Sequence, residues 1–133
     1  MQMQTLARIA ERLESGETTS RALTEAALAR IEDPDGEGAA AFIRVFRGPA
    51  LAEADASDAL RAQGIVPSPM AGIPFSIKDL CDVAGLTTNA GSVVMRNTPP
   101  AKADAPVVAR LRAAGAVIMG TTNMTEFACG GLG

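Results

Sequence analysis

The first half of the chain spaces its apolar residues as amphipathic helices do. Apolar positions that recur every three or four residues predict one helix over 6–15 and a second over 20–31, which Thr19 or Ser20 can cap. An alanine-rich third helix is expected over 49–63. The stripe of the second helix expected to face the core consists of Leu23, Ala27 and Ile31.

Three short apolar runs predict strands at 41–46, 73–77 and 116–120. Pro74 lacks a backbone N–H, which confines the second run to a strand start or a sheet edge. Between the second and third strands, Asp104 is expected to cap a helix that has a proline in its first turn. The predicted buried stripe of this helix consists of Val107, Val108, Leu111 and Ala114.

The order strand–helix–strand with short joints predicts a parallel pair and an α/β fold. We expect N-terminal helices, followed by part of a mixed or mainly parallel sheet with flanking helices. Residues 1–69 would form a helical lead-in with one strand, and 70–133 the start of the α/β core. Three strands make an incomplete sheet, and the glycine-rich "FACGGLG" directly follows a core strand. We therefore expect an N-terminal fragment of one longer domain.

Composition and charge narrow the function classes. The net charge is −3, with four Phe and no Trp or Tyr among 133 residues, which disfavours direct nucleic-acid binding. No apolar run approaches the length of a membrane span, and the N-terminus lacks a signal-peptide pattern, so a cytoplasmic protein is expected. Cys81 and Cys129 are expected to be reduced thiols packed as small hydrophobes.

The chain contains no histidine. A Ser-His-Asp triad, a Cys-His pair or a histidine-ligated metal is therefore excluded for these residues. No metal and no cofactor is expected. Any acid–base chemistry would depend on Lys, Asp, Glu or Cys side chains.

Lys78 ends an otherwise apolar run in "GIPFSIKDL". Alternation places Lys78 and Ser76 on the strand face away from Phe75 and Ile77. One interpretation is a solvated lysine beside Asp79. The other is a general base at the carboxyl end of a sheet strand, where α/β sheets place their ligands. Such a base must be neutral, which burial favours and Asp79 opposes.

Other candidates have adequate structural explanations. A serine two residues from a lysine on one strand is more often a hydrogen-bonded wall residue than part of a Ser–Lys dyad. Asn123 and Glu126 fit a helix capping box, and Met124 and Phe127 are expected in the core. The "GGLG" of residues 130–133 serves either a turn or an anion-binding backbone.

Three blocks of the chain resemble the amidase signature family. They are "MAGIPFSIKDL", "GLTTNAGS" and "ADAPVVARLRAAGAVIMGTTNMTEFACGGLG", so the resemblance runs from about Met70 to the end. The family cleaves or transfers amide bonds with a Ser–Ser–Lys triad, and its lysine lies in the "IKD" block. By this resemblance Lys78 is the base, and Asp79 is structural.

The resemblance also implies what this chain lacks. Both triad serines would follow Gly133, and neither Ser76 nor Ser92 matches them. The segment after "TEFA" would line the acyl-binding cavity, with Ala128, Cys129 and Gly130 contributing mainly backbone. A small-molecule amide is the implied substrate. A homodimer, or a missing C-terminal portion of the chain, would be the partner.

Three alternatives stay open. The protein could be the A subunit of a glutamyl-tRNA amidotransferase, which releases ammonia from glutamine. It could also be a non-catalytic α/β binding module that uses "GGLG" as an anion nest. A Schiff-base enzyme using Lys78 is the third possibility. The amidase hypothesis predicts that these 133 residues alone do not hydrolyse an amide.

Overall fold

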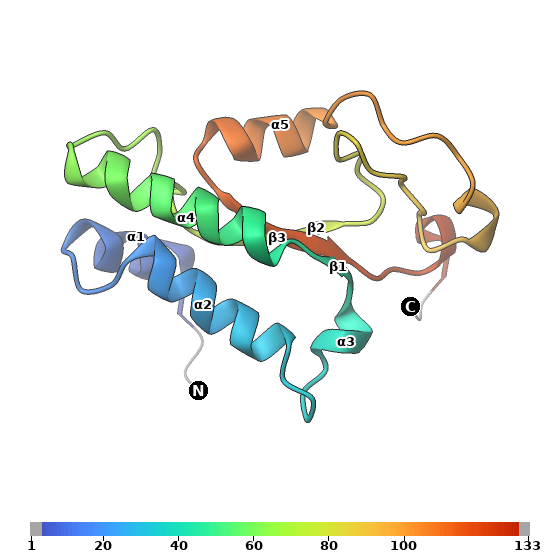
Figure 1. The fold of residues 1–133 in the computed structure, drawn as a ribbon, viewed down its shortest axis with the longest axis horizontal. Coiled ribbons are helices and arrows are strands. Elements are labelled where there is room, and N and C mark those ends of the chain that lie inside the picture. The colour runs from blue at the N-terminus through green and yellow to red at the C-terminus, as the bar shows by residue number, and fades with distance from the viewer. Residues whose placement is uncertain (1–3, 131–133) are drawn as a thin grey trace.

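The computed structural model describes residues 4–130, which form five α-helices, three β-strands and two short 3₁₀ turns (Figure 1). The helices are α1 (Leu6–Glu14), α2 (Ser20–Ile31), α3 (Gly38–Ala41), α4 (Arg47–Ala62) and α5 (Pro106–Ala113). The strands are β1 (Phe42–Val45), β2 (Pro74–Lys78) and β3 (Val117–Thr122), and the 3₁₀ turns are η1 (Val93–Met95) and η2 (Glu126–Ala128). The predicted mixture of helices and strands is confirmed.

The three strands form one mixed sheet in the order β1-β3-β2. β3 lies in the middle, antiparallel to β1 and parallel to β2, so the predicted parallel pair is confirmed. β2 is an edge strand of this sheet and begins at Pro74, as its missing N–H requires. β3 is buried along nearly its whole length, which is typical of a central strand covered on both faces.

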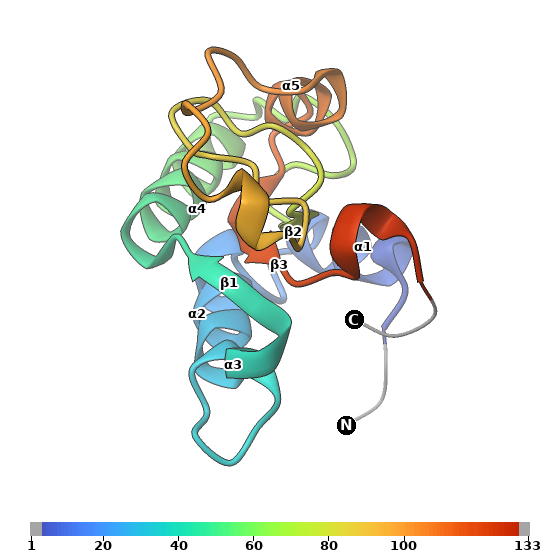
Figure 2. The same ribbon diagram turned by 90° about the vertical axis from the view of Figure 1, so that its right-hand side faces the viewer.

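Helices cover both faces of the sheet (Figure 2). α2 and α4 pack against each other, and their shared face contacts β3. This side of the core consists of Leu28, Ala50, Ala54, Val117 and Met119. The opposite side, under α5 and the chain after β2, consists of Ile77, Val83, Val108 and Ile118.

The buried stripe of α2 is displaced by one position along the chain from the predicted one, so the two stripes share no residue. Ser20, Thr24 and Leu28 are buried, whereas the predicted stripe is only half-buried. The Ser20 hydroxyl donates to the carbonyl oxygen of Gly72 at 2.8 Å. A Cβ atom at Gly72 would lie 2.9 Å from the Cβ of Ser20, so only small residues allow this approach. The buried face of α2 is therefore set by close packing of Ser20 against Gly72, and not by hydrophobicity alone.

The predicted cap of α5 is wrong. Asp104 lies one residue too early, because the alanine after it occupies the cap position. The Asp104 carboxylate instead accepts from the Ala84 N–H at 2.8 Å and from Arg112 at 3.0 Å. Val108 is fully buried on α5, whereas Val107 is half exposed, because one short helix presents only a narrow stripe to the sheet.

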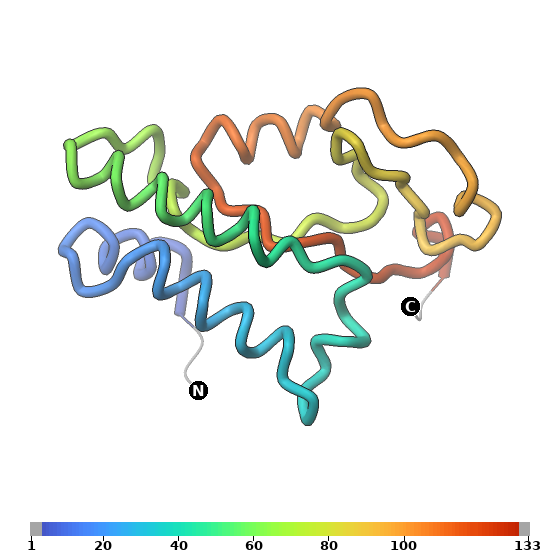
Figure 3. The backbone as a smooth tube through the Cα atoms, viewed as in Figure 1, coloured from blue at the N-terminus to red at the C-terminus, as the bar shows by residue number. Residues whose placement is uncertain are grey.

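The chain between β2 and α5 is long and irregular, as predicted, apart from η1. It passes around the carboxyl ends of β2 and β3 before it returns to α5 (Figure 3). Backbone hydrogen bonds join its two arms: Gly85 donates to Ala101, and Ala101 donates to Leu86, both at 2.9 Å. The segment is therefore held in place at the end of the sheet where the sequence predicts chemistry.

Candidate active site

Lys78 is the last residue of β2 and pairs with Thr122, the last residue of β3. Residues paired across strands place their side chains on one face, so Lys78 shares a face with Thr122 and Phe42. Thr121 and Arg44, one step along the ladder, belong to the opposite face. Phe42 packs against the core between α2 and β3. Lys78 therefore lies at the carboxyl end of the sheet, on the α2 side.

The Lys78 side chain is exposed and makes no hydrogen bond or ion pair with any described residue. Leu80 is 47% exposed, so the neighbouring apolar residues do not enclose the amine. The burial that would favour a neutral base is thus not supplied by residues 4–130. These residues place the Lys78 amino group at the end of β2, where it forms no ion pair with a described carboxylate.

Ser76 is also exposed, and its hydroxyl makes no hydrogen bond with a described residue. The predicted role of a hydrogen-bonded wall residue is therefore wrong. Ser76 borders an open hollow of about 370 Å³, which Phe42, Met119 and the end of α2 also line. Ser76 and Lys78 are therefore both exposed on this face of β2 within residues 4–130.

Asp79 has the opposite environment to Lys78. Its side chain is 2% exposed, and one Arg44 nitrogen lies 3.4 Å from its Oδ1. Its Oδ2 is buried and has no hydrogen-bond partner among residues 4–130. Burial raises the pKa of the Asp79 carboxyl above its ordinary value, and the Arg44 charge and the amide groups of Asn89 offset only part of this increase.

Two backbone hydrogen bonds connect the end of β2 to the turn η2. The Ala90 N–H donates to the Asp79 carbonyl at 2.9 Å, and the Phe127 N–H donates to the Ala90 carbonyl at 2.8 Å. Ala90, Phe127 and Ala128 all have left-handed backbone angles, with φ of 51°, 50° and 60°. Such angles are costly for residues with a Cβ and concentrate at functional sites. The strained turn is therefore attached to the strand that carries Lys78.

The predicted capping box at the start of η2 is wrong. The Asn123 side chain accepts from the N–H of Met124, its immediate neighbour, at 2.9 Å. Glu126 reaches out of its own turn and accepts from the buried Ser92 hydroxyl at 2.6 Å. A partner 34 residues away thus replaced the local one, because the loop after β2 lies against η2. Phe127, predicted in the core, is 47% exposed, whereas Met124 is buried as predicted.

Ala128, Cys129 and Gly130 are exposed and follow directly on the turn. The N–H groups of Ala128 and Cys129 donate back to Thr125 and Glu126, both at 2.9 Å, so they are not free for a ligand. The exposure of Cys129 contradicts its predicted packing, whereas Cys81 is half-buried and packs against the core. The remainder of "GGLG", residues 131–133, lies outside the described residues.

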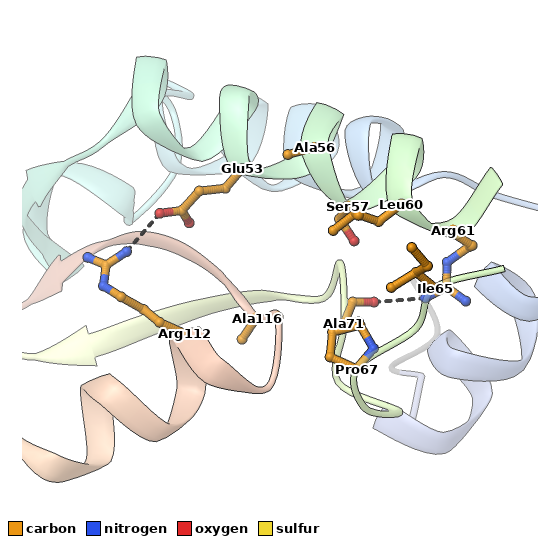
Figure 4. Close-up of a pocket in the computed structure, with 11 residues that line it drawn as sticks. Glu53, Ala56, Ser57, Leu60, Arg61, Ile65, Pro67, Ala71, Arg112 and Ala116 are labelled. Carbon is orange, nitrogen blue, oxygen red and sulfur yellow. Dashed lines mark hydrogen bonds and ion pairs between the residues drawn. The ribbon is translucent and has the colours of Figure 1, made fainter. Parts of the chain in front are cut away.

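An apolar cavity of about 240 Å³ lies at the other end of the sheet, between α4 and α5 (Figure 4). The apolar side chains of Leu60, Ile65 and Ala116 line it. The Glu53–Arg112 ion pair flanks it at 2.7 Å. This cavity is near the amino ends of β2 and β3, so it is separate from the residues predicted to carry chemistry.

Within 4–130, no three His, Cys, Asp or Glu side chains gather closely enough to hold a metal ion. No helix in the same range has the length and hydrophobicity that a membrane crossing needs.

Arg44 is the residue near this site that the sequence did not single out. A charged residue in the apolar run "AFIRVF" is the signal that was available. It did not identify a partner, because Asp79 lies 35 positions further along the chain.

Comparisons with known proteins agree on one family. A family model described as Amidase matches residues 22–132. The AtzE subunit of the 1-carboxybiuret hydrolase of Pseudomonas sp. (strain ADP) is 50% identical over 122 residues, which cover 92% of this chain and 26% of that protein. The A subunit of the glutamyl-tRNA(Gln) amidotransferase of Streptomyces coelicolor is 46% identical over 126 residues, which cover 95% and 25%.

Solved structures give the same result. A structure described as a vestigial protein complex that reveals the origins of an s-triazine catabolic enzyme matches with a TM-score of 0.87 and 48% identity, covering 96% of this chain and 28% of that one. The native peptide amidase of Stenotrophomonas maltophilia matches with a TM-score of 0.81 and 38% identity, covering 93% and 25%. The chain spans about a quarter of the length of the curated relatives it matches.

Proposed function

Because the chain belongs to the amidase family, we propose that it is part of a hydrolase that cleaves the amide bond of a small carboxamide, with Lys78 as the general base. The observation that carries the proposal is the place of Lys78. It stands at the carboxyl end of a parallel strand, exposed, with no acidic partner among the described residues. Ligands of open α/β sheets bind at this end of the strands.

The proposed reaction has two steps. In the first, the neutral Lys78 amine accepts, through an intermediary serine, the proton of a nucleophilic serine. The serine oxygen attacks the amide carbonyl carbon, and the C–N bond breaks. The leaving amine takes up the proton that Lys78 accepted. In the second step, water attacks the resulting acyl-enzyme ester and releases the carboxylic acid. The family resemblance supports this mechanism, because it supplies a lysine base and residues 1–133 contain no histidine.

The two serines are proposed to lie beyond Gly133. Ser76 and Ser92 do not fit the role. Ser92 is buried and already donates to Glu126. Ser76 lies on the same strand as Lys78, two residues before it. We propose that 1–133 is the N-terminal part of one amidase domain, with 1–69 as a helical lead-in and 70–133 as the start of the core. The greater length of the relatives supports a domain that is longer than these 133 residues.

Ala128, Cys129 and Gly130 are proposed to form part of the wall of the acyl-binding cavity. Their exposure, and the hydrogen bonds that join η2 to the end of β2, support this role. Because the N–H groups of Ala128 and Cys129 are occupied, their contribution to a substrate would be carbonyl oxygens and surface. A second copy, or the remainder of the chain, is proposed to cover the exposed face of β2. A cytoplasmic location stays a prediction.

A transamidating subunit is the alternative function. The amidotransferase relative is nearly as similar as the hydrolase relative, at 46% against 50% identity. The two functions differ in what accepts the acyl group or the ammonia. Steady-state assays of the purified protein, as its gene encodes it, would separate them. Hydrolysis of a simple carboxamide without any partner supports the amidase, whereas glutaminase activity that requires a partner and tRNA supports the alternative.

The test of the proposal is the loss of amide hydrolysis in a Lys78→Ala variant of this protein. A purified chain of residues 1–133 is expected to hydrolyse no carboxamide. If that short chain did so, and Lys78→Ala abolished its activity, the proposed serines beyond Gly133 would be ruled out.

A further inference from the structure

A polar hollow of about 330 Å³ lies where Arg44 emerges from β1, on the face of the sheet away from Lys78. Its polar lining comes from Arg44, Thr87, Asn89, Ser92, Arg96 and Asn123. Two guanidinium groups thus border one hollow, and none of its lining residues is an Asp or a Glu. Its lining is therefore positively charged and rich in hydrogen-bond donors.

Both guanidinium groups keep donors free. Arg96 is exposed, and its side chain makes no hydrogen bond or ion pair with any described residue. Arg44 uses one nitrogen, which lies 3.4 Å from Asp79 Oδ1, a distance too long for a strong charge-assisted bond. A guanidinium group carries five N–H donors, so most of those on Arg44 remain available.

The two nearest acids leave this charge incompletely balanced. The Glu126 carboxylate accepts from the Ser92 hydroxyl at 2.6 Å. Asp79 is buried, and its Oδ1 lies 3.4 Å from one Arg44 nitrogen. Neither acid lines the hollow.

We propose that this hollow binds a small oxyanion, a carboxylate or phosphate group, between Arg44 and Arg96. Guanidinium groups match the geometry of such anions through paired N–H donors, and the combined charge favours an anion over a neutral ligand. The site is distinct from the proposed amidase site, because the sheet separates it from Lys78. Arg44 nevertheless connects the two, since its partner Asp79 directly follows Lys78.

Isothermal titration calorimetry on the purified protein, as its gene encodes it, tests the proposal. The probes are succinate, inorganic phosphate and the neutral succinamide, all at one ionic strength. We expect at least one anion to bind with a defined stoichiometry and succinamide not to bind. Arg96→Gln should weaken binding by about tenfold or more, because it removes a charge-assisted contact from an exposed residue. Whichever anion binds more tightly identifies the chemistry of the ligand.

Arg110→Gln is the matched control, since Arg110 is an exposed arginine on α5 whose side chain has no partner among the described residues. It should leave anion binding unchanged. Lys78→Ala should also leave it unchanged, so loss of amidase activity and loss of anion binding are separate results. The proposal is overturned if neither anion binds, if succinamide binds equally well, or if Arg110→Gln weakens binding as much as Arg96→Gln.

Discussion

The Arg44 guanidinium lies 3.4 Å from the buried carboxyl of Asp79, the residue directly after Lys78. The contact crosses the central strand β3 and joins the two outer strands of the sheet. The Arg44 charge therefore lies near the end of β2, on the face of the sheet opposite to Lys78, the proposed base.

Lys78→Ala should abolish amide hydrolysis without unfolding the protein. The side chain makes no hydrogen bond or ion pair with any described residue, so its removal breaks no contact within residues 4–130 and should leave the fold intact. Loss of a general base should lower kcat by about 10²–10⁴-fold. Steady-state kinetics and thermal unfolding measure the two effects.

Lys102→Ala is the control for this variant, because Lys102 is the other lysine of the chain and is also exposed. It should keep full activity. If Lys78→Ala retained wild-type kcat, the assignment of the base would be wrong.

Arg44→Gln should destabilise the protein more at neutral pH than at acid pH. The positive charge of Arg44 lowers the free-energy cost of burying the ionised Asp79 carboxylate. In the Arg44→Gln variant, the pKa of Asp79 should therefore rise further. We expect a loss of about 1–3 kcal/mol at pH 7. The loss should shrink once the carboxyl is protonated. Urea unfolding at pH 4 and pH 7 would show this, and an equal loss at both values would contradict it.

Asp79 itself should make the folded state less stable as pH rises. Its folded pKa is raised above the ordinary 3.8, so between these two values the folded chain binds more protons than the unfolded chain. The free energy of unfolding therefore contains a part that is present below pH 3.8 and lost as pH rises through the folded pKa. Relative to wild type, Asp79→Asn should gain stability across this interval. A constant difference between the two proteins from pH 3 to pH 8 would exclude the effect.

Gly91→Ala should destabilise the protein more than Gly16→Ala. Both glycines have left-handed backbone angles, with φ of 68° and 74°. A Cβ at Gly91 would lie 2.6 Å from the Met124 carbonyl oxygen, whereas a Cβ at Gly16 meets nothing within 4 Å. The shared backbone cost is about 1 kcal/mol, and the clash should add about 1–3 kcal/mol. Chemical denaturation of both variants measures the difference, and equal losses would contradict the close approach.

Ser92→Ala should loosen the turn η2. It removes the 2.6 Å hydrogen bond to Glu126 and should cost about 1–2 kcal/mol. If Ala128, Cys129 and Gly130 line the acyl cavity, KM should rise more than kcat falls. Ser15→Ala is the control, because Ser15 is an exposed serine far from η2 in the sequence. It should alter neither constant. Unchanged kinetics in Ser92→Ala would argue against the wall assignment.

The strand and helix types could be predicted because they depend on local periodicity. Alternation around Phe75 and Ile77 was sufficient to predict a strand at 73–77, and Pro74 confined it to a strand start or a sheet edge; β2 is an edge strand that spans Pro74–Lys78. The strand–helix–strand order was sufficient for the parallel pair. The three sequence blocks that resemble one family were likewise sufficient to identify that family, because each block is a continuous run of residues.

Contacts between distant segments were decided only by the tertiary structure. Glu126 bonds to Ser92 instead of its own helix cap, the Asp104 carboxylate accepts from the Ala84 N–H as well as from Arg112 of α5, and α2 buries its Ser20 side. Glu126, Asp104 and Ser20 each bond to a partner 20 or more residues away along the chain. The sequence by itself thus determined the longer helices, the three strands, their order and the family of this protein. Packing decided which side chains are exposed, because burial depends on what the folded chain brings alongside each residue.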